Sequence, residues 1–121
     1  MVNDDIKKNV LQQLKHFLCQ FRSFHGTYIP PQRTADLVEL LHRSANISIT
    51  LDKENPLSVM ETLTMVLCVL NTSDDDIADV LSVSLSTVQS YVERVKDKLN
   101  VTTKIKAVKT VLRKGIIKII Y

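Results

Sequence analysis

Three polar residues in the C-terminal half, Gln89, Ser90 and Glu93, have side chains that could read the edges of base pairs. A glutamine amide can bond adenine at two positions, and a glutamate carboxylate can accept a hydrogen bond from the amino group of cytosine. The three residues lie at positions i, i+1 and i+4, so on a helix they would share one side with Ser86. The sequence therefore predicts either a base-reading set or a merely solvated polar face.

Basic residues follow directly after this set. Residues 57–93 contain six acidic residues and no Lys or Arg, whereas residues 94–121 contain nine Lys or Arg against a single acid. A positive C-terminal third suits a polyanion or an acidic partner. The residues that we expect to contact phosphates lie where the charge changes sign: Arg94, Lys98 and Lys104, with further help from Lys96 and Lys109.

Two short amphipathic helices are predicted to position these side chains. In residues 84–99 the apolar residues recur at spacings of three, four, three and four, which indicates one buried stripe, and Ser84 can cap the helix. A preceding helix is expected over 74–81 with Ser73 as its cap, and only three residues separate the two helices. This arrangement is typical of a helix-turn-helix, whose second helix lies in the major groove. The stripe consists of Leu85, Val88, Val92, Val95 and Leu99.

Helices are also expected on both sides of this pair. Ser58 and Glu61 form a capping box for a helix whose core face contains Leu63, Val66, Leu67 and Leu70. Asn71 and Asn100 can take the left-handed conformation that ends a helix. Thr103 can cap a last helix through Lys114, with Gly115 closing it and with Ile105, Val108 and Leu112 as the predicted inner face.

The N-terminal half predicts a helix from Asp4 to about Phe24 and a second helix that is capped by Thr34 and runs through about Arg43. The aromatic stripe of the first could pack within the chain, across a dimer, or in the groove of a partner. Residues 44–56 read as a polar connection in which 47–51 alternate as a short strand or an extended linker. The apolar tail 116–121 is expected to dock on the domain, on residues 47–51, or across a dimer.

Composition excludes several classes of protein. Two Gly and three Pro favour a mostly helical chain, and no run of eighteen apolar residues exists that could cross a membrane. The N-terminus has acids where a signal peptide would be basic, so we expect a cytoplasmic location. Cys19 and Cys68 are predicted to be buried reduced thiols. With no phosphate loop, metal-ligand spacing or nucleophile-and-base pairing, neither an enzyme nor a cofactor is expected.

Residues spread over the C-terminal half carry a family resemblance. They are Leu57, Ser58, Glu61, Ser73, Ile77, Ala78, Leu81, Ser84, Thr87, Val88, Val95, Lys98, Leu99, Val101, Ala107 and Gly115. In this order and spacing, over about sixty residues, the sequence resembles the LuxR/FixJ-type C-terminal DNA-binding domain. The resemblance implies four helices, of which the third enters the major groove and the fourth often forms a two-fold dimer contact.

The sequence departs from this family at four positions. Met60, Asp75, Gln89 and Tyr91 stand where the family usually has Arg, Lys, Lys and His, so several phosphate and base contacts are weakened or changed. Acids at 74–76 suit the dipole of a helix N-terminus, but they would repel phosphates if that end faced DNA.

The sequence therefore predicts an all-α protein with an N-terminal helical dimerisation or partner-docking segment, 1–56, and a helix-turn-helix DNA-binding domain, 57–121. We expect a transcriptional regulator that binds double-stranded DNA as a homodimer, with a possible regulatory protein partner on the N-terminal helices. The alternative is an adaptor or antagonist of another regulator that keeps the fold without binding DNA. The predicted DNA-binding residues are Ser86, Thr87, Gln89, Ser90, Glu93, Arg94, Lys96, Lys98, Lys104 and Lys109, and the predicted dimer contacts are Phe17, Phe21, Ala107, Thr110 and Val111.

Overall fold

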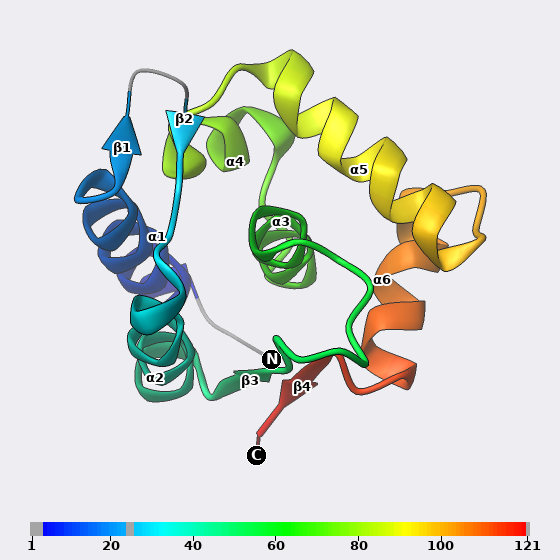
Figure 1. Ribbon diagram of the computed structural model, residues 1–121, viewed down its shortest axis with the longest axis horizontal. Helices are drawn as coiled ribbons and strands as arrows, with labels where there is room; N and C mark the ends of the chain where they lie inside the picture. Colours follow the sequence, from blue (N-terminus) through cyan, green and yellow to red (C-terminus); the bar gives the residue numbers. More distant parts are fainter. Residues whose placement is uncertain (1–3, 24–25, 121) are drawn as a thin grey trace.

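The computed structural model describes residues 4–23 and 26–120, which are mostly helical (Figure 1). The α-helices are α1 (Asp4–Cys19), α2 (Thr34–Ala45), α3 (Val59–Val69), α4 (Asp74–Leu81), α5 (Leu85–Leu99) and α6 (Lys104–Arg113). A 3-10 helix, η1 (Pro31–Arg33), precedes α2. The short strands are β1 (Arg22–Ser23), β2 (Gly26–Thr27), β3 (Ile47–Ile49) and β4 (Ile117–Ile119). The predicted fold class is confirmed.

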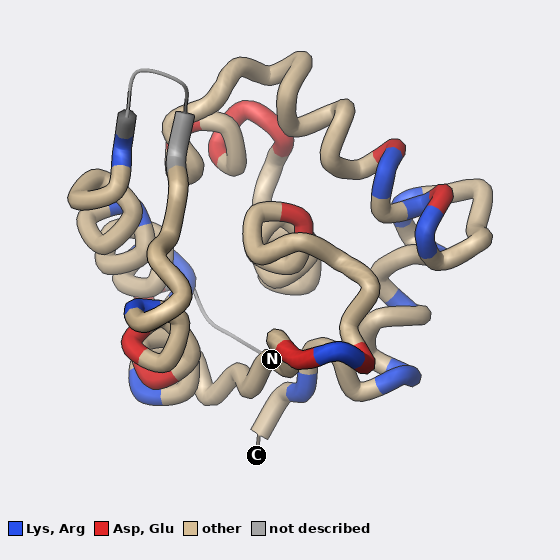
Figure 2. Tube along the Cα trace, viewed as in Figure 1, with Lys and Arg blue, Asp and Glu red and all other residues tan. Residues whose placement is uncertain are grey.

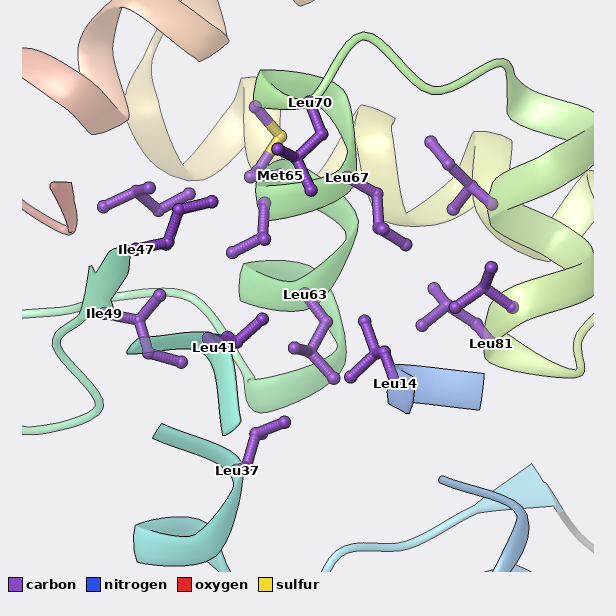
Figure 3. Close-up of a cluster of buried hydrophobic side chains, with 14 of the residues drawn as sticks. Leu14, Leu37, Leu41, Ile47, Ile49, Leu63, Met65, Leu67, Leu70 and Leu81 are labelled. Carbon is purple, nitrogen blue, oxygen red and sulfur yellow. The ribbon is translucent and has the colours of Figure 1, made fainter. Parts of the chain in front are cut away.

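Helix α3 lies at the centre, with the other helices arranged around it (Figure 1). Its residues 61–67 are all buried, and apart from Glu61 they are all apolar residues or threonines. Helices of this kind are found inside a protein rather than on its surface. In the close-up of the core, Leu63 faces Leu14 of α1 and Leu41 of α2, and Leu67 points toward α4 (Figure 3). One hydrophobic core therefore joins the two halves of the chain.

The predicted helix caps are present. The side chains of Ser58, Ser73, Ser84 and Thr103 each accept a hydrogen bond from the backbone N–H three residues later. Glu61 returns a bond to the N–H of Ser58, which completes the capping box. Such caps satisfy N–H groups that have no partner within the helix, each stabilising it by about 1 kcal/mol. Asn71 and Asn100 have the positive φ expected of residues that end a helix.

The C-terminal tail docks on residues 47–51, one of the three alternatives left open by the sequence. Strand β4 pairs antiparallel with β3, with Ile47 opposite Ile119 and Ile49 opposite Ile117. Two bonds extend the ladder: the Thr50 N–H donates to the Ile116 carbonyl at 2.9 Å, and the Ile120 N–H to the Asn46 carbonyl at 2.7 Å. The segment 1–56 and the segment 57–121 are therefore joined by a strand pair as well as by the core.

The first helix ends earlier than predicted. It stops at Cys19, where the N–H of Phe21 turns back to the carbonyl of Leu18, and the chain continues into the hairpin of β1 and β2. Phe21 still packs edge to face on Phe17, at 5.2 Å between ring centroids, so the aromatic contact continues beyond the last residue of the helix. The predicted end of the helix at Phe24 was wrong, and Phe24 itself lies outside the described residues.

The start of the second helix also differs from the prediction. Thr34 is the first residue of α2 and not its cap, because η1 leads directly into the helix. The Thr34 hydroxyl instead donates to the carbonyl of Pro31 at 2.7 Å. A proline at the first position of η1 favours this continuous start, since its φ is already helical.

The inner face of α6 was predicted wrongly at two of its three residues, since only Val108 packs against the core. Ala107, Thr110 and Val111 are buried, whereas Ile105 is 68% exposed and Leu112 is 37% exposed. Two apolar stripes lie side by side on this short helix, and the stripe with the small Ala107 permits the closer approach to the core. Thr110 can be buried because its hydroxyl donates to the carbonyl of Lys106, four residues back.

Three smaller predictions about burial are also corrected. Leu85 is 40% exposed because it is the first residue of α5 and precedes the buried stripe. Cys19 is exposed at the end of α1, so it is not a buried thiol. Cys68 is half-buried, and burial raises the pKa of its thiol to about 11, which keeps it protonated near neutral pH.

The docked tail predicts that truncating two isoleucines of β4 lowers the free energy of unfolding by different amounts. Ile117→Ala should lower the free energy of unfolding by about 3 kcal/mol, because it empties a fully buried site. Ile119→Ala, at a position that is 37% exposed, should cost less than about 1 kcal/mol. Urea unfolding followed by circular dichroism would measure both. Equal losses would show that β4 does not dock in this register.

Candidate nucleic-acid interface

Helices α4 and α5 are joined by the turn 82–84 and form the predicted helix-turn-helix. Ser82 adopts the left-handed conformation with φ of 57°, and the N–H of Val83 donates back to the carbonyl of Ala78. Val88, Val92 and Val95 then face inward from α5. Because these valines are held in the core, the opposite side of α5 is turned outward.

The outer side of α5 carries the predicted base-reading residues. Ser86, Gln89, Ser90 and Glu93 are exposed, and no other described element covers this side of the helix in Figure 1. Thr87 is half-buried, and its hydroxyl lies 2.9 Å from the hydroxyl of Ser84. The structure thus brings the predicted set together on one open surface, which we call the readout face: Ser86, Gln89, Ser90 and Glu93.

Three of the five predicted phosphate-contacting cations form ion pairs within the chain. Lys96 pairs with Glu93 at 2.6 Å, three residues earlier on α5. Lys104, the first residue of α6, pairs with Asp74, the first residue of α4, at 2.8 Å. The hydrogen bond to Asp74 raises the pKa of Lys104, since it stabilises the ammonium form.

The third ion pair is the most deeply placed. Lys98 lies 2.6 Å from the carboxylate of Glu61, whose side chain is only 3% exposed. The same Glu61 oxygen accepts the capping bond from Ser58. Removing one partner of a buried pair leaves the other charge without compensation, which is strongly destabilising. Lys98 therefore stabilises the packing of α5 on α3 and is not simply a surface charge.

Arg94 and Lys109 remain as exposed predicted cations that have no ion pair within the described residues. Figure 2 shows basic residues along the end of α5 and on α6, with acidic residues at the start of α4. Asp75 and Asp76 are exposed there, whereas Asp74 is compensated by Lys104. The acidic start of α4 and the basic start of α6 are thus brought together by the ion pair between Asp74 and Lys104.

Counting charges along the sequence could not have identified the acidic partners. Glu61 and Lys98 are 37 residues apart, and Asp74 and Lys104 are 30 apart. Only the packing of α3 and α4 against α5 and α6 brings these groups together. The sequence indicated the capping box of Glu61 but not the burial of its carboxylate, and it is the burial that requires a partner.

Most of the predicted dimer contacts are already used inside one chain. Ala107, Thr110 and Val111 are buried in the core. Phe17 is buried, and the guanidinium of Arg33 lies 5.7 Å from its ring centroid and 5.1 Å from that of Phe21. The exposed large apolar residues of α6 are instead Ile105 and Leu112.

The described part of the chain shows neither of two other kinds of site. Within residues 4–23 and 26–120, no three His, Cys, Asp or Glu side chains gather where they could hold a metal ion. None of the helices in these ranges is long and apolar enough to cross a membrane.

The capped helices α3 to α6 and the outward face of α5 define a helix-turn-helix domain. Residues 55–111, which include α3, α4, α5 and most of α6, match the family model of bacterial regulatory proteins of the luxR family, GerE. The C-terminal half of the chain is thus a luxR-family helix-turn-helix domain. No curated protein matches the chain.

The ion pair between Lys98 and Glu61 predicts an effect on stability that Arg94 does not share. Lys98→Met should lower the free energy of unfolding by about 1 to 3 kcal/mol, because Glu61 is left charged and buried. Arg94→Met, a matched loss of one exposed cation on α5, should change it by less than about 0.5 kcal/mol. Adding Glu61→Gln to Lys98→Met should recover part of the loss. Chemical denaturation measures these free energies of unfolding. If Lys98→Met and Arg94→Met were equally stable, the stabilising role assigned to the ion pair of Lys98 would be wrong.

Proposed function

We propose that the protein is a transcriptional regulator of the cytoplasm that binds double-stranded DNA through α5 as a homodimer. The observation that carries this proposal is the readout face, which is exposed on the second helix of a luxR-family helix-turn-helix. Gln89 and Glu93 supply the groups that can recognise adenine and cytosine in the major groove.

The N-terminal half leaves this face uncovered. Helix α1 packs against α4, where Lys15 pairs with Asp79 at 3.0 Å and Lys7 donates to the carbonyl of Asn71 at 2.7 Å. The outer side of α5 is on the far side of the helix pair from α1 (Figure 1). This placement supports DNA binding by the chain in the described conformation, without a movement of the N-terminal helices.

A homodimer follows from the small size of the readout face. One short recognition helix contacts few base pairs, and two-fold dimers of helix-turn-helix proteins read two half-sites. We place the dimer contact on the exposed side of α6, at Ile105 and Leu112, since the residues first predicted for it are buried.

A second candidate is an adaptor or antagonist that keeps the fold without binding DNA. The ion pairs of Lys96, Lys98 and Lys104 favour it, because each removes a cation that could have contacted a phosphate. The exposed Asp75 and Asp76 favour it as well, since they add negative charge beside the helix-turn-helix. DNA binding must then rest on the remaining cations, of which Arg94 lies on α5 itself.

Glu93→Lys separates the two functions. It removes an acid from the readout face and frees Lys96, so binding to random-sequence duplexes should tighten by about tenfold at low salt. If Glu93 reads a cytosine, the preference for a selected site over random DNA should fall at the same time. Fluorescence anisotropy at several salt concentrations measures both effects, with Glu54→Lys, an exposed acid outside the helix-turn-helix, as the matched control. No change in affinity or preference would support the adaptor function instead.

Ile105→Glu tests the dimer contact. A carboxylate at the centre of an apolar contact should shift the protein from dimer to monomer, while an acid near the N-terminus of α6 should not harm the helix. Tyr28→Glu is the control, because its side chain is 66% exposed and the residue directly follows β2, which lies away from α6 (Figure 1). Sedimentation velocity at tens of micromolar protein should show a dimer for wild type and Tyr28→Glu only. A wild-type protein that stays monomeric would refute the homodimer.

A further inference from the structure

A polar cavity lies where the N-terminal half meets the turn of the helix-turn-helix. Its volume is about 470 Å³. Lys15 of α1 and Arg22 of β1 line it from one side, and Asp79, Ser82 and Ser84 from the other, together with Ala78 and Val83. Cations from the segment outside the family match are thus brought against the start of the recognition helix.

The charges in this cavity leave one cation uncompensated. The ammonium of Lys15 lies 3.0 Å from both carboxylate oxygens of Asp79, so these two charges balance. Arg22 is exposed and forms no ion pair with any residue in the described ranges. An arginine guanidinium can donate two parallel hydrogen bonds to the oxygens of a phosphate. Arg22 is therefore the group in the cavity that is available to an anion.

The cavity borders the readout face at Ser84. This residue lines the cavity, and its hydroxyl lies 3.0 Å from the hydroxyl of Ser86, the first residue of that face. The N-terminal end of α5 adds partial positive charge at the same place. A phosphate seated here would belong to the backbone beside the groove that α5 enters.

The backbone next to Arg22 is anchored to the rest of the chain. The preceding residue, Phe21, packs on Phe17, and the N–H of Tyr28 donates to the carbonyl of Phe21 at 3.2 Å. Lys15 and Asp79 connect α1 to α4, the helix before the turn. Because these contacts exist before binding, the backbone need not rearrange when a phosphate is bound, and only the Arg22 side chain has to be ordered.

We infer that this cavity is a binding site for a DNA backbone phosphate and that Arg22 is its principal ligand. The inference rests on the proposed function and extends it, because it gives the N-terminal half a direct part in the DNA interface. The contact is independent of sequence, since phosphates position a protein and do not identify bases. It also supplies a cation that the ion-paired lysines of α5 and α6 do not.

The test uses the full chain and random-sequence duplexes of about 25 base pairs, long enough to cover the interface. Arg22→Gln should weaken binding three- to tenfold at moderate salt and reduce the slope of log affinity against log salt by about one. Arg22→Lys should keep the slope. Arg43→Gln is the matched control: it removes an exposed arginine from α2, on the groove between α1 and α2, and should change neither quantity.

The outcomes separate the inference from the proposed function. In one outcome the wild-type protein binds DNA, and Arg22→Gln and Arg43→Gln bind it with the same affinity and salt dependence. This result would overturn the phosphate site and leave the proposed function intact. Wild-type protein that binds no duplex at any salt concentration would overturn both. Inorganic phosphate could raise the melting temperature of the wild-type protein but not of Arg22→Gln, while the DNA affinity of the two stays the same. This result would assign the cavity to a small anion and overturn the inference.

Discussion

The structure depends on the burial of α3 on all sides. An apolar helix cannot be left in water, so every other helix contributes a face to its cover: Leu14 from α1, Leu41 from α2 and Leu81 from α4 are fully or almost fully buried around it. This constraint explains why the N-terminal half is not a separate appendage. The family-matched segment alone would leave part of α3 exposed, and α1 and α2 supply the missing cover.

The same constraint fixes the orientation of the recognition helix. Val88, Val92 and Val95 of α5 are held in the core, and Lys98 is drawn to the buried carboxylate of Glu61. Two kinds of interaction, one apolar and one ionic, thus determine which side of α5 is turned outward. The ionic one has a cost for function, because a cation committed to Glu61 contributes less to the attraction of DNA.

Local signals in the sequence predicted the helix-turn-helix well. Caps such as Ser58, Ser84 and Asn100 act within four residues of themselves, so their effect can be read without knowing the fold. The inner face of α6 could not be predicted in the same way, because the more apolar side of this helix carries Ile105 and Leu112, whereas packing against the core buries the side with the small Ala107. The partners of Lys98 and Lys104, and the cavity that contains Arg22, likewise arise from tertiary packing between distant segments.

The pairing of β3 with β4 also has a consequence for the order of folding. The two strands are separated by the whole helix-turn-helix, so closing them requires a loop of nearly seventy residues whose ends meet at Ile49 and Ile117. The loss of chain entropy on closing such a loop is recovered only after the intervening helices have become compact. The helices, which depend on local caps, can form first, and the two strands pair late in folding. Weakening the pairing of β3 with β4 should therefore leave the rate of folding nearly unchanged and increase the rate of unfolding.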